Sequence, residues 1–282
     1  MISESGKNLS LSSYSLDKLL PNSLLSSPAV SIRTSDTLAD ATGLLAHHLE
    51  SFTDSLVVTK EDHPVGMMGG IELFKSILNS PPFSDKTLIS EIMNENIIII
   101  SKETTLAELL KIWSQTRRAF AIAPNQYHSY SAISARKLLE IGSFCKTNMR
   151  LSNIPKKQII TFDKDYTVKD IIISMFDNNA RKLILENTSL FISDRIMAEK
   201  LASNLSYLQN VNNFLNMRAD IFKLDSAKVI SDDLEIPEAC KIMYEMLSPY
   251  LLTKDQVVSP WDIALILGSE NLTDYDWQTR TA

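Results

Sequence analysis

The sequence predicts an α/β (α+β) protein in which one β-α-β-β-α unit is repeated four times. A strand that turns sharply into a helix occurs four times, most clearly over residues 256–267. The apolar stripes of four other helices begin at residues 38, 106, 168 and 236, at intervals of 68, 62 and 68 residues. The strands are short apolar runs without alternation, as expected of strands covered on both faces. Because one unit cannot cover its own sheet, we expect the units to pair.

Each unit has an opening helix with apolar residues at i, i+3, i+4 and i+7, the pattern of a helix with one buried face. The four stripes span residues 38–49, 106–113, 168–176 and 236–247. We expect polar residues just before these helices to cap them. The expected caps are Ser35 with Asp36, Thr104, Asp165, and Ser231 with Asp232.

One strand is expected before each opening helix, and two strands and a closing helix after it. The preceding strands are expected at 30–32, 97–100, 159–162 and 228–230. The later strand pairs are expected at 55–59 and 65–68, 119–123 and 131–133, 182–185 and 190–192, and 250–253 and 256–258. The closing helices are expected at 71–78, 135–141, 194–205 and 260–267. We expect Met67, Met68, Trp113 and the isoleucine run 97–100 in the core.

The composition describes a soluble globular chain long enough for two ordinary domains. Of the 282 residues, 44% are hydrophobic and 22% charged, and only 7 are glycine, which argues against a linker-rich chain. The net charge of −6 gives no support for binding nucleic acid or an anionic membrane. No apolar run approaches the ~20 residues of a membrane span, and no signal peptide is visible.

The two cysteines, Cys145 and Cys240, are far apart in the sequence and form no CxxC motif, so we interpret them as reduced core thiols. The histidines show no metal-ligand spacing, and no nucleophile stands with a matching base. We therefore expect a cytoplasmic protein without a metal, a required cofactor or an enzymatic activity.

The unit of about 60 residues, its Thr-Leu or Thr-Val helix start and its Ser-x-x-Asp turn resemble the cystathionine-β-synthase (CBS) domain. The segments Asp17–Pro21 and Ser90–Met93 are similar to the segment that precedes the first strand in that family. The resemblance covers roughly residues 13–270, as CBS motifs at 13–80, 84–144, 147–205 and 218–270. It implies that units one and two form one module, that units three and four form another, and that the two modules can form a disc. We expect a connector over 145–155 and an extended helix over 205–218.

The CBS family binds adenine nucleotides in clefts between paired units. The ribose hydroxyls there bind the aspartate of a Gly-hydrophobic-x-Thr/Ser-x-x-Asp motif. A carboxylate accepts hydrogen bonds from two neighbouring hydroxyls, and a helix N-terminus favours phosphate. The fourth copy keeps Ser259 and Asp262 but has no glycine, with Pro260 at the first helical position and Val258 facing the expected base slot.

The other three copies depart further from the motif. The first keeps Gly66 but has Glu72 in place of the aspartate, which makes it a weak second site. The second has Lys137 at the acid position, and the third has Ser193 but an apolar Ile196 there. The resemblance therefore implies a nucleotide site at Asp262 in the second module, with Ser193 as a further contact. Arg181 and Lys228 are candidate cations for phosphate.

Ordinary structural roles compete with these assignments. Ser-x-x-Asp before an apolar helix is also a capping box, and an exposed cation such as Arg181 is commonly solvated. Two functional hypotheses stay open: a stand-alone regulatory protein that binds AMP, ADP or ATP and modulates a protein partner, or an interaction scaffold with decayed sites. Exposed faces of the closing helices, around Phe74 and Ile77 or Leu138 and Leu139, suggest a homodimer.

Overall fold

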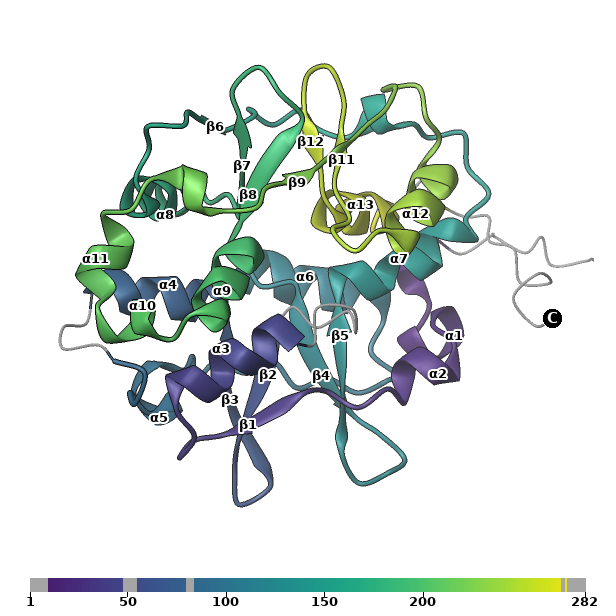
Figure 1. Cartoon of the computed structure of the whole chain (residues 1–282). Helices are drawn as coiled ribbons and strands as arrows, with labels where there is room; N and C mark the ends of the chain where they lie inside the picture. Colours follow the sequence, from purple (N-terminus) through teal and green to yellow (C-terminus); the bar gives the residue numbers. More distant parts are fainter. Residues whose placement is uncertain (1–9, 48–54, 80–83, 270–271, 273–282) are drawn as a thin grey trace, which may run out of the picture. The chain divides into compact units, whose positions relative to one another are not determined.

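The computed structural model describes residues 10–47, 55–79, 84–269 and 272, and the structural statements that follow concern these residues (Figure 1). The chain divides into two compact units. One unit, here called the even unit, contains Met1–Pro28, Ile99–Lys156 and Ile230–Ala282, and therefore the second and fourth repeats. The other, the odd unit, contains Ala29–Ile98 and Lys157–Val229, and therefore the first and third repeats.

The odd unit is built from two β-α-β-β-α repeats with one strand added to the second of them. The first repeat consists of β1 (Ser31–Arg33), α3 (Leu38–His47), β2 (Ser55–Lys60), β3 (His63–Gly69) and α4 (Gly70–Asn79). The third consists of β6 (Thr161–Phe162), α8 (Val168–Asp177), β7 (Lys182–Leu185), β8 (Leu190–Ser193) and α9 (Asp194–Ser203). Their sheets have the orders β1-β2-β3 and β6-β7-β8-β9, where β9 is Asp225–Ser226. In both, the first strand is parallel to the second, and the second is antiparallel to the third.

The even unit has a similar arrangement, but the sheet of its second repeat has only two strands and the strands of its fourth repeat are two residues long. The second repeat has α6 (Leu106–Thr116), β4 (Phe120–Pro124), β5 (Tyr130–Ser134) and α7 (Ala135–Ser143). The fourth has α12 (Ile236–Glu245), β11 (Leu251–Leu252), β12 (Val257–Val258) and α13 (Pro260–Leu267), preceded in the chain by β10 (Lys228–Val229). Helix α7 packs against both α12 and α13. The predicted α+β class with four repeats is confirmed.

The expected strand over residues 97–100 does not form, and this part of the prediction is wrong. Only an isolated parallel bridge joins Ile99 to Ile122, supported by a 2.9 Å bond from the Ile100 N–H to the Ile122 carbonyl. Ile100 is buried, but Ile99 is 52% exposed. The chain passes from the odd to the even unit within this run, which explains why it does not join one sheet. Met67, Met68 and Trp113 are buried as predicted.

The opening helices begin at the expected residues, but their N-caps lie one to four residues after the expected caps. The caps are threonines in reciprocal boxes: Thr105 with Glu108, and Thr167 with Asp170. Thr37 and Asp40 make the same exchange before α3, where the Asp40 N–H donates to Thr37 Oγ1 at 3.3 Å. In each case a carboxylate three residues on accepts from the threonine N–H, so both groups are satisfied. The fourth opening helix starts after Glu235 without a side-chain cap and has a proline in its first turn.

A lead-in segment before each repeat docks on a different repeat. In all four cases the N–H of the first helical residue of an opening helix donates to a lead-in carbonyl. The bonds are Leu38 to Thr87 (2.9 Å), Leu106 to Tyr14 (3.0 Å), Val168 to Met217 (2.9 Å) and Ile236 to Met149 (2.9 Å). Repeats one and two thus exchange lead-ins, and so do repeats three and four.

The lead-ins are short helical segments. They comprise η1 (Leu11–Ser13), α1 (Leu16–Leu19) and α2 (Asn22–Leu25) for the first repeat, α5 (Ile89–Ile92) for the second, η3 (Leu151–Asn153) for the third, and α10 (Ser206–Gln209), α11 (Val211–Leu215) and η4 (Ala219–Ile221) for the fourth. The lead-ins link repeats one with two and three with four, whereas the compact units contain repeats one with three and two with four. The predicted modules of repeats one with two and three with four therefore stay a prediction.

The expected extended helix over residues 205–218 is wrong. Helices α10 and α11 are interrupted at Asn210, whose backbone φ and ψ of −131° and 70° are not helical. The Asn210 side chain accepts a 3.1 Å hydrogen bond from the Asn213 N–H. Because asparagine satisfies helix N–H groups well as an N-cap, it starts a new helix here instead of continuing the first.

The closing helices do not offer the exposed faces that were expected to form a homodimer. Phe74, Ile77, Leu138 and Leu139 are all buried within the chain. In the odd unit α4 packs against α9, and in the even unit α7 packs against α12 and α13. These apolar residues therefore serve the core, and no dimer follows from them.

Both cysteines are buried free thiols, and burial raises the pKa of Cys145 to about 12 and that of Cys240 well above its usual value. Among the described residues, none of the helices is long and apolar enough to cross a membrane.

Candidate functional site

The first turn of α13 holds the four residues predicted from the fourth repeat. Val258 ends β12, Ser259 is the N-cap, Pro260 is the first helical residue, and Asp262 follows in the same turn. Asp262 Oδ2 accepts hydrogen bonds from the Ser259 N–H (2.9 Å) and the Ser259 hydroxyl (2.6 Å). Asp262 is only 5% exposed. The carboxylate is therefore held at the positive end of the helix, and Oδ2 performs the capping role that competed with ribose binding.

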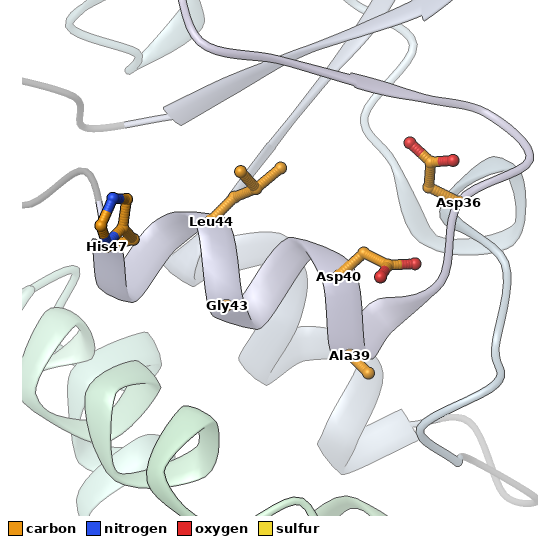
Figure 2. A pocket seen from close by; sticks show the side chains of 6 residues that line it. All are labelled: Asp36, Ala39, Asp40, Gly43, Leu44 and His47. Carbon is orange, nitrogen blue, oxygen red and sulfur yellow. The ribbon is translucent and has the colours of Figure 1, made fainter.

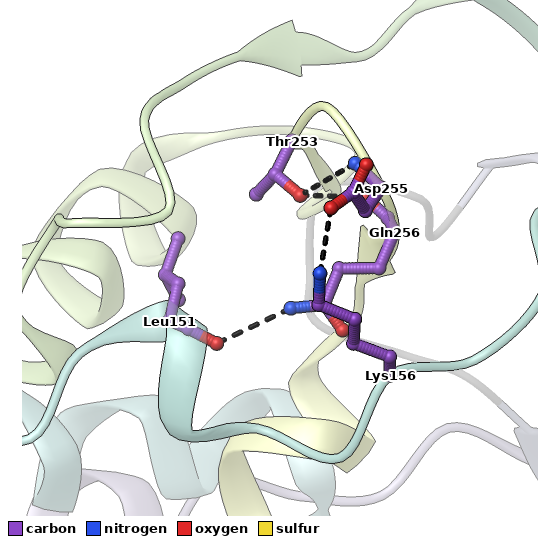
Figure 3. A network of polar contacts seen from close by, with 5 residues as sticks. All are labelled: Leu151, Lys156, Thr253, Asp255 and Gln256. Carbon is purple, nitrogen blue, oxygen red and sulfur yellow. Dashed lines mark hydrogen bonds and ion pairs between the residues drawn. The ribbon is translucent and has the colours of Figure 1, made fainter.

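The lost glycine of the fourth copy is explained by the lead-ins. In the first repeat, a side chain on Gly66 would overlap the Asn94 carbonyl, because this lead-in backbone pairs with Met67. In the fourth repeat, Gln256 stands in place of the glycine. Its side-chain amide donates to the Leu151 carbonyl of the third lead-in at 3.2 Å, as Figure 3 shows. Both residues hold a lead-in, one by allowing close approach and the other by a buried hydrogen bond.

An exposed ion pair lies next to this buried bond. Lys156 Nζ is 2.6 Å from Asp255 Oδ2 (Figure 3). The Lys156 ammonium lowers the pKa of Asp255, and the Asp255 carboxylate raises the pKa of Lys156. Because both groups are well exposed, the pair adds little to stability compared with the bond of Gln256.

Two further predicted site residues, Arg181 and Ser193, lie in the odd unit. Arg181 contacts Asp194 Oδ2 through both Nη2 (2.6 Å) and Nε (2.8 Å), so this cation is engaged with a carboxylate of its own unit. Ser193 caps α9 by accepting a 3.2 Å bond from the Ile196 N–H. Lys228 is exposed on β10. The structure thus brings Asp262, Ser259, Pro260 and Val258 together, and it places Lys228 on β10, in the same sheet as β11 and β12. Arg181 and Ser193 belong to the odd unit.

The weak second site also has a capping role. Glu72 is buried and accepts a 3.1 Å hydrogen bond from the Gly69 N–H at the start of α4. Sequence reasoning missed its neighbour Asp194, the first residue of α9, which is buried against Gly70 so closely that a side chain on Gly70 would overlap it. The signal available in the sequence was an acid directly after the Ser193 cap, two positions earlier than the motif requires.

The start of α7 has the opposite charge, and its partners were also missed. Arg136 Nη1 donates to the Leu247 carbonyl at 2.8 Å, and Nη2 donates to the Met246 carbonyl, just after α12 ends. A cation there is favourable because the C-terminal carbonyls of a helix carry partial negative charge. Lys137 Nζ donates to the Leu24 carbonyl of α2 at 3.1 Å. Burial lowers the pKa of Lys137 to about 8.

Trp261, next to Asp262, lies 6.3 Å from Trp113 of α6 between ring centroids, with the rings tilted by 45°. Trp113 is fully buried, whereas Trp261 is partly exposed. An indole adjacent to the candidate carboxylate gives a fluorescence signal for changes at this helix start.

A surface hollow of about 600 Å³ lies along one face of α3 in the odd unit. Figure 2 shows its lining, with Asp36 and Asp40 toward one end and His47 at the other; Ala39, Gly43 and Leu44 complete it. The hydrogen bonds from Thr37 lower the pKa of Asp40. None of the predicted site residues lines this hollow. No group of three metal-binding side chains occurs in the part of the chain that the structure describes.

The sequence matches no protein-family model and no curated protein. Among solved structures, the chain is similar to MJ1225 from Methanocaldococcus jannaschii, described as a proposed archaeal homologue of g-AMPK. The TM-score is 0.71 at 17% identity, over 89% of this chain and 99% of that one. An uncharacterised conserved protein from Pyrococcus horikoshii matches with a TM-score of 0.53 at 11% identity, over 87% and 98%.

The CBS-domain containing protein ATU1752 from Agrobacterium tumefaciens matches 40% of this chain and 87% of its own, with a TM-score of 0.36 at 18% identity. The chain therefore has the α+β fold of CBS-domain proteins, with four repeats.

Proposed function

We propose that this chain is a regulatory protein whose fourth repeat binds the ribose of an adenine nucleotide, AMP, ADP or ATP, and that binding changes its interaction with a protein partner. The single observation that carries the proposal is the Asp262 carboxylate at the N-terminus of α13. Its Oδ2 is fixed by two bonds from Ser259, so the group is already oriented when a ligand arrives. A preorganised carboxylate is suited to accept from neighbouring hydroxyls.

Two features of α13 add support. The helix N-terminus offers partial positive charge for a phosphate group, and Val258 on the adjoining strand provides an apolar neighbour for a base. Lys228 stays a proposed contact of the nucleotide, because β10 belongs to the same sheet as β12. Arg181 and Ser193 stay predictions from the sequence. Arg181 must leave Asp194 before it can bind a phosphate, so we expect a smaller contribution from it than from Asp262.

The test is titration of the purified chain with AMP, ADP, ATP and S-adenosylmethionine, followed by calorimetry and by Trp261 fluorescence. Replacing Asp262 with Ala removes a charge-assisted hydrogen-bond acceptor worth about 1.5–3 kcal/mol, so we expect affinity to fall by ~10- to 150-fold. A ligand at a hundred times its Kd adds about 2.7 kcal/mol to the stability of the wild type.

Asp170→Ala is a matched control, because it removes a cap of the same geometry elsewhere. Asp170 Oδ2 accepts from the Thr167 N–H at 2.9 Å and from its hydroxyl at 2.6 Å, the same distances as at Ser259. Both variants lose a helix cap, and only the loss at Asp262 is expected to change nucleotide affinity. Equal nucleotide affinity in both variants would count against the proposed site.

The second candidate function is a scaffold without a nucleotide. The observation in its favour is that Glu72, Asp194 and Asp262 are all buried at starts of closing helices, and each accepts a hydrogen bond within its own unit. A scaffold should show no stabilisation by any nucleotide in the panel and should bind its protein partner equally with and without them.

A further inference from the structure

The four closing helices differ in the charge buried in their first turns. Helices α4, α9 and α13 each bury a carboxylate there, from Glu72, Asp194 and Asp262 respectively. The positive end of each of these helices is thus matched by an anion of the chain. Helix α7 has no acidic residue in its first turn and buries Lys137 instead.

Lys137 is 4% exposed. Among the described residues its side chain has one hydrogen bond, to the neutral Leu24 carbonyl, and it takes part in no ion pair. An ammonium group has three N–H donors, so two remain for another acceptor. A charge buried without a counter-ion at the positive end of a helix is strongly unfavourable, and buried charges are normally paired.

The N-cap of α7 gives a second, independent observation. Ser134 is 1% exposed, and its hydroxyl has no hydrogen-bond partner within the described part of the chain. The equivalent serines of α9 and α13 do have partners: Ser193 accepts from Ile196, and Ser259 donates to Asp262. A buried hydroxyl without a partner is rare, because its desolvation is then uncompensated.

The neighbouring Arg136 adds a second buried cation to this turn, although it already donates to the carbonyls of Met246 and Leu247. A tetrahedral oxyanion at the helix start would accept from the Ser134 hydroxyl and the Lys137 ammonium together. It would also replace the carboxylate that the other three closing helices supply.

We propose that the N-terminus of α7 is an oxyanion site in which Ser134 and Lys137 bind a phosphate group. This site differs from the proposed ribose site in repeat, residues and charge. A carboxylate that accepts from sugar hydroxyls defines the start of α13, whereas the cation and the hydroxyl at the start of α7 recognise a phosphate. The phosphate can be inorganic or part of a nucleotide.

Lys137 also contacts α2 through the Leu24 carbonyl. The Leu24 carbonyl lacks the usual helical partner four residues on, because that residue is Pro28, which has no N–H. Lys137 supplies this hydrogen bond instead and holds α2 in place. Binding of an oxyanion therefore adds a second partner to a lysine that already anchors the N-terminal segment, and we expect it to slow hydrogen exchange in residues 22–26.

The experiment measures thermal unfolding and isothermal titration of the full chain with inorganic phosphate, against potassium chloride of equal ionic strength. We expect saturable stabilisation by phosphate alone in the wild type. Lys137→Met should weaken phosphate binding by ~10- to 150-fold, and Ser134→Ala should weaken it less. Lys111→Met, which removes an exposed lysine from α6, is the matched control and should change nothing.

Two further arms separate the sources of the phosphate and the two proposed sites. AMP that competes with inorganic phosphate, while adenosine does not, identifies the phosphate group of a nucleotide as a ligand. Asp262→Ala should leave phosphate binding intact even if it abolishes ribose recognition. Absence of saturable binding beyond the chloride control, or unchanged binding in both Lys137→Met and Ser134→Ala, would overturn the proposal. Ser134→Ala keeps the test decisive if the lysine variant does not fold.

Discussion

Lys137 makes a contribution to the stability of the chain that depends on pH between about 8 and 10.5. Burial lowers its pKa from 10.5 to about 8, because the charged form has lost most of its hydration. In the unfolded chain the amine binds its proton up to about pH 10.5, whereas in the folded chain it releases the proton near pH 8. At this residue the unfolded state therefore binds more protons between these values, and the contribution of Lys137 to the free energy of unfolding rises with pH across that window.

The magnitude follows from the difference between the two pKa values. A shift of this size corresponds to at most about 3 kcal/mol, gained between pH 8 and 10.5 and absent below pH 8. In Lys137→Met the gain disappears, because no ionisable group remains at the position. Other groups titrate in both proteins alike, so the difference between the two curves isolates Lys137.

The assay is urea unfolding of both proteins at half-unit pH intervals from 7 to 10.5, in buffers without phosphate or sulfate. We expect the wild-type curve to rise relative to that of Lys137→Met as the pH increases. Parallel curves would mean that the ammonium is hydrated or paired in the folded state, and the argument from uncompensated burial would fail. Addition of phosphate should raise the pKa of Lys137 and flatten the rise.

Two further predictions concern packing and the lead-ins. Gly142→Ala should lower stability by about 1–3 kcal/mol, because the new methyl overlaps Cys240 Sγ. This loss outweighs the better helix propensity of alanine. Thermal unfolding should show partial rescue in the double variant with Cys240→Ala. Gln256→Leu should lower stability by about 0.5–1.5 kcal/mol, because the bond to the Leu151 carbonyl is lost. Lys156→Met, which removes one partner of the exposed ion pair nearby, should have little effect. Urea unfolding measures both. Equal losses in the last two variants would contradict the ranking of buried over exposed bonds.

Local signals predicted the closing helices well. Helix α13 spans Pro260–Leu267, as expected, because an N-cap serine, a proline at the first position and an apolar run all specify the same start. The caps of the opening helices were placed too early, since Ser35 and Thr104 resemble caps as much as Thr37 and Thr105 do. The distinction depends on the acid three residues later, which completes the capping box.

The candidate sites depend on contacts between residues far apart in the chain, which no local pattern carries. The approach of Lys137 to Leu24, of Gln256 to Leu151 and of Asp194 to Gly70 follows from how repeats and lead-ins pack. Sequence alone indicated a cation in place of an acid at Lys137, but not that the cation is buried. The isoleucine run 97–100 was wrongly predicted to form a strand, because apolar composition does not show where a chain crosses between units.

The exchange of lead-ins affects how the protein is made. The segment with Leu11, Leu16, Leu19 and Leu20 leaves the ribosome long before its docking surface in the second repeat, so these leucines stay uncovered until that repeat emerges. A fragment that contains a single repeat would keep the lead-in that precedes this repeat. It would lack the lead-in that binds the start of its opening helix. For this reason the smallest part of the chain that satisfies its own helix starts is a consecutive pair of repeats, the first with the second or the third with the fourth.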